Sequence, residues 1–329
     1  MPDASAAVPL RVQVGELIMS GFPGTSAPAW MRARLAGREL GGVILFGYNV
    51  ASRTQVRALG AQVQAAAHGD ALIALDQEGG QVRRLPWASP LRDGFQQSTT
   101  QIAYRSAQAA ARDLAAVGAN VNLAPVADVA LGATSEMRRR AFPGNADSVS
   151  TLVTAALRGY RGRGVAPAVK HFPGFGAARA NTDDAVVRID RTAAQLESTE
   201  LKPFRAAIAA RVPIVMVAHA LYPAYDGQRI ASQSPAILQT LLRTELGFKG
   251  VVVTDSMEAR AVLARSSVQE AAERSIRAGA DIVLLSGSGS YLPVYNRLLA
   301  RARSDSAFRA RVGEAYVRVR ALKDSLRNQ

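Results

Sequence analysis

Residues 55–80 read QVRALGAQVQAAAHGDALIALDQEGG, and this stretch holds one complete unit of the fold. In Gln55–Ala67, Val, Leu and Ala recur at three-to-four spacing, which predicts an amphipathic helix. A polar turn with a glycine follows, and Ala71–Gln77 is then a continuous apolar run of the kind that forms strands buried on both faces. Charged residues, Asp76 and Glu78, come where that strand would end. The stretch therefore predicts a helix packed on a parallel sheet, with titratable groups at the carboxyl end of the strand.

The same alternation repeats along the chain, and the helix-like segments are long enough to cross over between parallel strands. Eight apolar runs predict a (β/α)8 barrel; a doubly wound open sheet is the alternative, which periodicity alone does not separate from it. With no linker or composition break, we expect one domain over residues 1–329, with the barrel core at about 10–290 and one or two closing helices in 291–329. The expected strands lie in Leu17–Phe22, Gly42–Phe46, Ala71–Gln77, Val121–Val129, Pro167–Pro173, Pro213–His219, Gly250–Asp255 and Asp281–Ser286, and the expected helices in Gln55–Ala67, Ile102–Ala116, Ser148–Tyr160, Ala193–Ala210, Ser234–Leu246 and Val268–Ala278.

The composition excludes several classes of protein. The chain has no cysteine, so disulfides, thiolate zinc sites and a cysteine nucleophile are excluded. Its formal net charge is +14, but the basic residues are nearly all arginine and are scattered, and aromatic residues make up only 6%. Solvated arginine faces explain this pattern better than a nucleic-acid-binding surface, so we expect no nucleic acid partner. No apolar run approaches the roughly 20 residues that span a bilayer, and no signal-peptide pattern opens the sequence, so we expect a cytoplasmic protein without membrane contact.

Titratable side chains stand at the ends of five of the eight expected strands. In a (β/α)8 barrel the carboxyl ends of the strands meet at one rim, and that rim carries the chemistry. One or two such residues would only mark where a strand meets water, but five at equivalent positions predict a site. These strand ends carry Asp76 and Glu78, then Asp128, then Lys170 and His171, then His219, then Asp255.

Short motifs along the chain make the prediction specific. They resemble, in order, the motifs of glycoside hydrolase family 3, and they are most similar to those of the bacterial single-domain β-N-acetylglucosaminidases of peptidoglycan recycling. The resemblance runs from about residue 12 to 290, and seven motifs in order are far more specific than one. The motifs are GGVILF at 41–46, DQEGGQVRRL at 76–85, NLAPVAD at 122–128, RAF at 140–142, KHFPGFG at 170–176, HALYP at 219–223 and GVVVTDSM at 250–257.

The resemblance assigns roles to individual residues. Cleavage of a glycosidic bond needs two groups that flank it, one of them usually a carboxylate. By resemblance Asp255 is the nucleophile of a retaining mechanism; a structural alternative is that it caps the helix that follows. The resemblance also implies a set of side chains that hold the sugar, namely Asp76, Arg84, Arg140, Lys170 and His171.

Three further residues have less specific roles. His219 either lines the pocket or orients its neighbours, and His171 has a structural alternative as the brace of its loop. We expect Asp128 and Glu78 to be structural and to fix loop backbones, with Glu78 also a candidate for supporting the residues that touch substrate.

The sequence departs from the family pattern in one loop. After the fifth strand the similar enzymes carry an Asp-Ser-His triplet whose histidine is the general acid/base, and this chain has Asn181-Thr182-Asp183 there. No histidine stands in that loop. Asp183 or Asp184 could act as the acid if its pKa were raised by burial or by the other carboxylate. Alternatively the protein cleaves only substrates with good leaving groups, or it binds sugar without turnover.

These observations predict an enzyme that releases terminal β-linked N-acetylglucosamine, or another N-acetylhexosamine, from cell-wall-derived or related glycans. We expect a carbohydrate substrate, no cofactor, no metal and a monomer. The alternatives are a β-glucosidase or β-xylosidase on the same scaffold and a catalytically weakened sugar-binding homologue. A metal-dependent barrel hydrolase using His171, His219, Asp76 and Asp255 is disfavoured, because the first strand lacks the usual His-x-His signature at its end.

Overall fold

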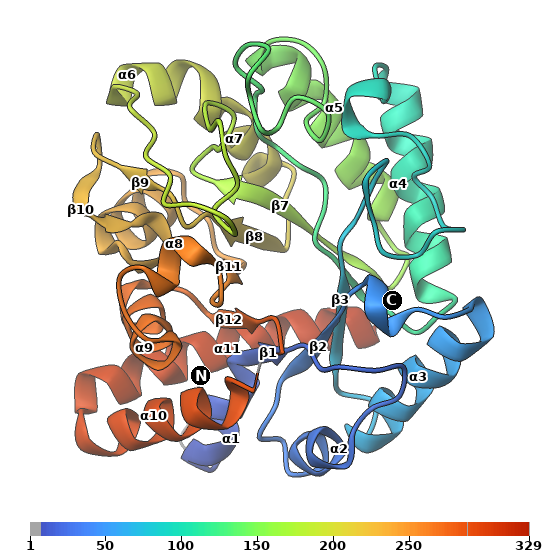
Figure 1. Cartoon of the computed structure of the whole chain (residues 1–329), viewed down its shortest axis with the longest axis vertical. Helices are drawn as coiled ribbons and strands as arrows, with labels where there is room; N and C mark the ends of the chain where they lie inside the picture. Colours follow the sequence, from blue (N-terminus) through green and yellow to red (C-terminus); the bar gives the residue numbers. More distant parts are fainter. Residues whose placement is uncertain (1–7, 288, 329) are drawn as a thin grey trace.

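The computed structural model describes residues 8–287 and 289–328, and its centre is a closed barrel of eight parallel strands (Figure 1). Neighbouring barrel strands follow one another in chain order, from β1 round to β12, which pairs with β1. Each expected apolar run overlaps one barrel strand, so the predicted (β/α)8 barrel is confirmed and the doubly wound alternative is excluded. The barrel strands are β1 (Ile18–Ser20), β2 (Gly42–Leu45), β3 (Leu72–Leu75), β6 (Val121–Asn122), β7 (Ala166–Phe172), β8 (Ile214–Val217), β11 (Val251–Ser256) and β12 (Ile282–Leu285).

Helices surround the barrel because each has one small, apolar face. In α4 the buried residues Ala103, Ala107 and Leu114 lie on one side, and the Thr99 side chain caps the helix by accepting a hydrogen bond from the Ile102 N–H at 3.2 Å. The helical elements are α1 (Leu10–Glu16), α2 (Ala29–Ala36), η1 (Gly47–Asn49), α3 (Arg53–Ala66), η2 (Gly94–Gln96), α4 (Thr100–Ala115), α5 (Ala146–Tyr160), α6 (Ala193–Gln195), η3 (Leu196–Glu200), α7 (Leu201–Ala209), η4 (Ala231–Gln233), η5 (Ala236–Glu245), α8 (Arg260–Leu263), α9 (Val268–Ala278), α10 (Tyr291–Ser304) and α11 (Ser306–Arg327).

The fourth strand is much shorter than the sequence pattern predicts. Of the apolar run Val121–Val129, only β6 is strand. The Asn122 side chain exchanges hydrogen bonds with the backbone of Gln77, at 3.0 and 3.1 Å, and Pro125 has no N–H to give to a ladder. The rest of the run is irregular backbone that stays buried on its way to the rim.

The sequence pattern also misses several small elements. Helices α1, α2 and α8 are too short to show a clear period, and two hairpins extend the rim beyond the barrel. The hairpins are β4 (Gln77–Gly79) with β5 (Val82–Arg83), and β9 (Leu221–Tyr222) with β10 (Asp226–Ile230). No helix within residues 8–287 and 289–328 has both the length and the apolar character needed to cross a bilayer.

Helix α11 closes the amino-terminal end of the barrel. Its Val319 and Leu322 belong to the same buried cluster as the inward-facing strand residues, and in Figure 1 the helix crosses behind β1 and β12. Around this contact, Lys323 pairs with the buried Glu16, and Arg320 pairs with Asp70. One end of the barrel is therefore plugged, and only the end at the strands' carboxyl termini is left for a site.

A substitution in α11 tests this packing. Leu322 is 6% exposed against the barrel interior, so Leu322→Ala removes buried methyl groups from a contact with little room to relax. We expect the free energy of unfolding to fall by about 2–4 kcal/mol. Val317 lies on the same helix and is 50% exposed, so Val317→Ala should change the free energy by no more than about 0.5 kcal/mol. Equal shifts in denaturant unfolding of the two variants would show that α11 does not seal the barrel.

Candidate active site

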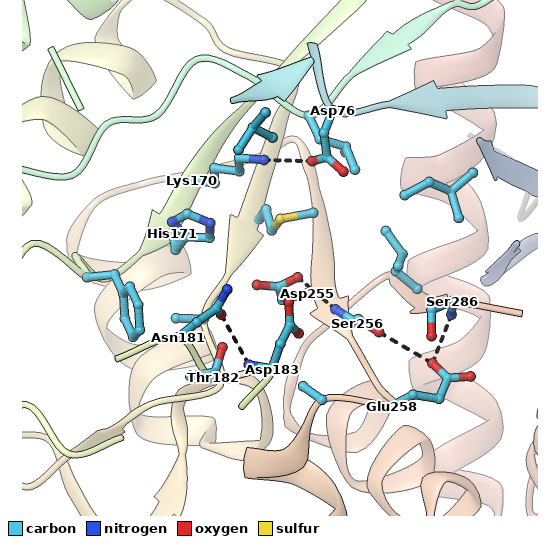
Figure 2. Close-up of a pocket in the computed structure, with 18 of the residues that line it drawn as sticks. Asp76, Lys170, His171, Asn181, Thr182, Asp183, Asp255, Ser256, Glu258 and Ser286 are labelled. Atoms are coloured by element: carbon cyan, nitrogen blue, oxygen red, sulfur yellow. Dashed lines mark hydrogen bonds and ion pairs between the residues drawn. The ribbon is translucent and has the colours of Figure 1, made fainter. Parts of the chain in front are cut away.

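A cavity of about 380 Å³ opens at the rim formed by the carboxyl ends of the strands (Figure 2). The elements around it are far apart in sequence: β2, β7, β8, β11 and β12 each bring side chains to it, and Asp76 follows directly after β3. Of the catalytic and sugar-binding residues expected from the sequence, Asp184 and His219 are not among those that line it. The named residues that do line it are Asp76, Arg84, Arg140, Lys170, His171, Asp183 and Asp255.

Opposite charges crowd the floor of this cavity. The Lys170 ammonium lies 2.7 Å from the Asp76 carboxylate, and Arg84 donates to the other oxygen of Asp76 at 3.2 Å. Burial alone would raise the pKa of Asp76, but the cations of Lys170 and Arg84 outweigh it and lower that pKa below its usual value. Burial would likewise lower the pKa of Lys170, yet the two carboxylates beside it, Asp76 and Glu78, raise it. Asp76 therefore stays a hydrogen-bond acceptor and Lys170 a donor at neutral pH.

Glu78 holds two of these donors in place. Its carboxylate accepts two hydrogen bonds from Arg140, at 2.7 and 2.9 Å, and its Oε1 lies 2.6 Å from Lys170 Nζ. Burial opposes the charge of Glu78, but Arg140 and Lys170 lower its pKa well below the usual range. Glu78 is not itself a lining residue of this cavity. A mainly structural role is expected for Glu78 from the sequence; its place two residues after Asp76, on the same strand end, is the signal for a supporting role.

Asp128 orients His171. The Asp128 carboxylate is fully buried, lies 2.7 Å from His171 Nδ1, and accepts hydrogen bonds from the backbone N–H groups of His171 and Phe175. On the other side of the ring, His171 Nε2 is 3.3 Å from the Arg140 guanidinium. Because a guanidinium only donates, this contact assigns the ring proton to Nδ1, facing Asp128. The imidazole is thus fixed in direction and in tautomer, which is more than the structural role expected for Asp128.

Two aspartates face one another at the centre of the cavity. Asp255 lies at the end of β11, where its Oδ1 accepts a hydrogen bond from the Ser256 N–H at 2.8 Å. Figure 2 shows Asp183 reaching toward it from the loop that follows β7. The pKa of Asp183 is raised to about 6, first by burial, then by the charge of Asp255 and then by that of Asp184. The cavity therefore contains a carboxyl group whose protonated form persists close to neutral pH.

Main-chain hydrogen bonds hold the Asp183 loop over the cavity. The carbonyl oxygens of Thr182 and Asp183 accept from the N–H groups of Ala261 and Arg260, at 3.0 and 3.2 Å. The Asn181 side chain accepts from the Asp183 N–H at 3.1 Å and shapes the turn. The loop is thus docked on the first turn of α8, directly after the strand that carries Asp255. These hydrogen bonds have no signature in the sequence, since every residue except proline supplies both a carbonyl and an N–H.

Asp184 and His219 are placed differently from their neighbours in sequence. Asp183 and Asp184 are both exposed residues, but only Asp183 lines the cavity, so Asp184 acts on the site only through its charge. His219 is completely buried, and its Nδ1 is 2.8 Å from Ser232 Oγ. Burial lowers its pKa, and the backbone of Asp255 and Ser256 lies close to the ring. Of the two roles expected for His219, this location favours orienting neighbours over lining the pocket.

Glu258 and Ser286 are among the lining residues that the sequence did not single out. Glu258 Oε2 accepts from the Ser286 N–H at 2.8 Å, which ties the end of β12 to the turn after β11. Glu258 stands three residues after Asp255, so its closeness to a strand end was the available signal. Within the described part of the chain, no group of three or more His, Asp and Glu side chains is arranged to hold a metal ion.

Known proteins resemble this chain over nearly its whole length. The model of the glycosyl hydrolase family 3 N-terminal domain matches residues 9–322. A β-hexosaminidase of Stenotrophomonas maltophilia is 35% identical over 282 residues, covering 82% of this chain and 83% of its own. An uncharacterized secreted glycosyl hydrolase of Arthroderma benhamiae is 31% identical over 97% of this chain and 95% of its own.

Solved structures are also similar to this chain over nearly its whole length. A family 3 β-N-acetylglucosaminidase from Paenibacillus sp. FPU-7 superposes with a TM-score of 0.93 at 35% identity; the match covers 97% of this chain but 63% of that longer one. A β-N-acetylhexosaminidase from Beutenbergia cavernae has a TM-score of 0.90 at 33% identity and is covered over 99% of its length.

Proposed function

Since the chain belongs to glycoside hydrolase family 3 and is a glycosidase, we propose that it releases terminal β-linked N-acetylhexosamine, N-acetylglucosamine first of all, with retention of configuration. The observation that carries the mechanism is the pair Asp183 and Asp255, one with a raised pKa, in a shared cavity. The preference for an acetamido sugar is supported by the named activities of similar proteins. Cell-wall-derived glycans are the proposed natural source, on the similarity of the motifs to those of recycling enzymes.

The buried charge cluster would hold the sugar that is cut off. Asp76 accepts hydrogen bonds from ring hydroxyls, while Lys170 and Arg84 donate them. Arg84 Nε is buried and has no hydrogen-bond partner within the described residues, so it is a donor still to be satisfied. Because Glu78 and Asp128 already fix Arg140 and His171, the site needs little reorganisation when sugar enters.

The reaction follows from the two carboxyl groups. A carboxylate oxygen of Asp255 attacks the anomeric carbon while the bond to the leaving oxygen breaks, and protonated Asp183 transfers its proton to that oxygen. The sugar is then an ester of Asp255. In the second half Asp183, now a carboxylate, takes a proton from water, whose oxygen attacks the anomeric carbon and releases Asp255. Asp183 thus takes the part that a histidine has in the similar enzymes.

The first experiment is a turnover assay with an aryl β-N-acetylglucosaminide and with N,N′-diacetylchitobiose, set beside binding of N-acetylglucosamine by calorimetry. We expect hydrolysis of both substrates. Aryl β-glucosides and β-xylosides, tested in parallel, should be cleaved more slowly. Binding of the sugar without hydrolysis of even the aryl glycoside would refute the proposal in favour of the sugar-binding alternative.

The pH dependence should report Asp183. The proton donor must be protonated in the free enzyme, so kcat/KM for the disaccharide should fall as pH rises through about 6, the pKa of Asp183. Below pH 6 Asp183 is already protonated, so kcat/KM should change little there. In Asp183→Asn the fall of kcat/KM with rising pH should vanish. The measurement is kcat/KM from pH 4.5 to 8.5 for both proteins, with thermal melting at each pH as the control for unfolding. A wild-type profile that stays level between pH 5 and 8 would contradict the role of Asp183.

A further inference from the structure

We propose that Phe46 and Tyr48, on the turn after β2, form a subsite that binds the pyranose on the leaving-group side of the scissile bond. The inference rests on the proposed function and adds the recognition of the second sugar. Its ligand class is a saccharide leaving group, held by stacking of its apolar C–H face on an aromatic surface.

The aromatic surface runs from the cavity to the outside of the molecule. Phe46 lines the cavity, and its ring stacks on that of Tyr48, with centroids 5.5 Å apart and planes 26° from parallel. The Arg84 guanidinium lies 5.7 Å from the centre of the Phe46 ring. Going outward, the Asp76–Arg84 pair of the sugar site is therefore followed by Phe46 and then by Tyr48. A glycan whose end is bound at Asp76 can continue outward along this face.

Tyr48 is exposed and yet held in one place. It is 55% exposed, and its hydroxyl donates to the Ser286 carbonyl at the end of β12, at 3.2 Å. The Ser286 N–H in turn donates to Glu258, which lines the cavity. This chain of contacts bridges the ends of β2 and β12 at the rim. Partial burial raises the pKa of Tyr48 further above its usual value, which is already far above neutral, so the phenol keeps its proton and this hydrogen bond at neutral pH.

The turn beneath the two rings is also anchored. Asn49 is fully buried; its Oδ1 accepts from the Phe46 N–H at 2.9 Å, and its Nδ2 donates to the carbonyls of Phe22 and Gly24 at 2.9 and 2.6 Å. An exposed aromatic ring contributes little to the stability of the fold, so stability alone does not explain why the turn that carries it is held so firmly. A rigid ring does reduce the entropy that binding a flat ligand would cost.

A saccharide matches this surface better than a charged or purely apolar group does. A pyranose has an apolar C–H face for the rings and hydroxyls at its edge, and aromatic residues with a polar tip suit ligands of that kind. The neighbouring Arg84 and Ser286 leave polar groups beside the rings for such hydroxyls. The surface is also continuous with the cavity that contains Asp183 and Asp255, where the leaving oxygen must lie.

The test compares substrates that differ only in the leaving group. For Tyr48→Ala we expect kcat/KM on N,N′-diacetylchitobiose to fall about 10-fold, mainly through KM, with no change on methyl β-N-acetylglucosaminide or in inhibition by N-acetylglucosamine. Tyr48→Phe keeps the stacking ring and should stay within about 3-fold of wild type. Phe95, an equally exposed ring (55%) outside the cavity, supplies the control Phe95→Ala, which should behave as wild type.

Binding measurements separate this proposal from the proposed function. In a protein that carries Asp255→Asn, Tyr48→Ala should weaken binding of the disaccharide about 10-fold and leave binding of N-acetylglucosamine unchanged, whether or not the wild type turns over. Equal effects on the two ligands, or no effect on either, would overturn the subsite. Absence of wild-type turnover together with selective loss of disaccharide binding would overturn the proposed hydrolysis and keep the subsite.

Discussion

Asp255→Asn should abolish turnover, with kcat lower than that of the wild type by about 10⁴-fold or more. The amide has the shape of the carboxylate, but it is a poor nucleophile and carries no charge to stabilise an oxocarbenium-like transition state. The fold should survive, because the hydrogen bond recorded for the Asp255 side chain, from the Ser256 N–H to Oδ1, can be accepted equally by an amide oxygen. The measurement is kcat on the aryl glycoside, with circular dichroism and melting temperature as controls for folding.

Trapping the covalent intermediate tests directly whether Asp255 is the nucleophile. A slow fluorinated N-acetylglucosaminyl donor should leave its sugar attached to the wild-type protein, and peptide mass spectrometry should place it on Asp255. Asp190→Asn is a matched control, because that carboxylate is 69% exposed on a surface loop and pairs only locally with Arg188. It should retain wild-type kcat and labelling. Label on another side chain, or near-normal rates in Asp255→Asn, would refute the assignment.

Asp183→Asn should slow hydrolysis most for those substrates whose leaving group needs a proton in order to depart. Disaccharides have a poor leaving group, and their kcat/KM should fall by about 10²–10⁴-fold. An aryl glycoside with an acidic phenol leaves without help, and its kcat/KM should fall by less than about 10-fold. The second half-reaction also loses its base, so azide, which needs none, should speed turnover of the aryl glycoside and yield the β-glycosyl azide.

The comparison with Asp184→Asn decides which of the two neighbouring aspartates donates the proton. Asp184 lies outside the cavity, so its loss should only remove some of the repulsion that raises the pKa of Asp183. For Asp184→Asn we expect near-normal kcat/KM at pH 5. The fall of kcat/KM with rising pH should occur at a modestly lower pH than in the wild type. If Asp184→Asn were the variant sensitive to the leaving group, or if Asp183→Asn slowed both substrate types equally, Asp183 would not be the donor.

Much of the architecture is predictable from the sequence because it depends on repeating patterns. Each barrel strand has to be apolar on both faces, and each helix between strands needs one small apolar side, so the alternation is written along the whole chain. The exceptions are instructive. The pattern of Val121–Val129 predicts one long strand, but the Asn122 side chain bonds the backbone of Gln77 and Pro125 has no N–H for a ladder, which no hydropathy pattern contains.

The residues of the candidate site also differ in how well the sequence predicts them. Residues such as Asp76, Lys170 and Asp255 stand at strand ends, so topology alone predicts that they converge. The partners of those residues are harder to predict, because Glu78 and Asp128 become important only through the guanidinium and imidazole that they meet in space. His219 also stands at a strand end, yet it does not line the cavity and its ring contacts Ser232 instead, since the direction of a side chain at a strand end depends on local backbone geometry.

The way in which the loop at 181–183 is attached has a consequence for how such an enzyme can change. Its attachment to α8 uses the backbone carbonyls of Thr182 and Asp183, which every amino acid possesses, and the N–H groups of Ala261 and Arg260, which every amino acid except proline possesses. The anchoring therefore does not depend on which side chain position 183 carries. Evolution, or a protein engineer, can therefore substitute the side chain at position 183 without detaching the loop. The pH optimum of the enzyme would then follow the pKa of the new side chain, while the barrel stays unchanged.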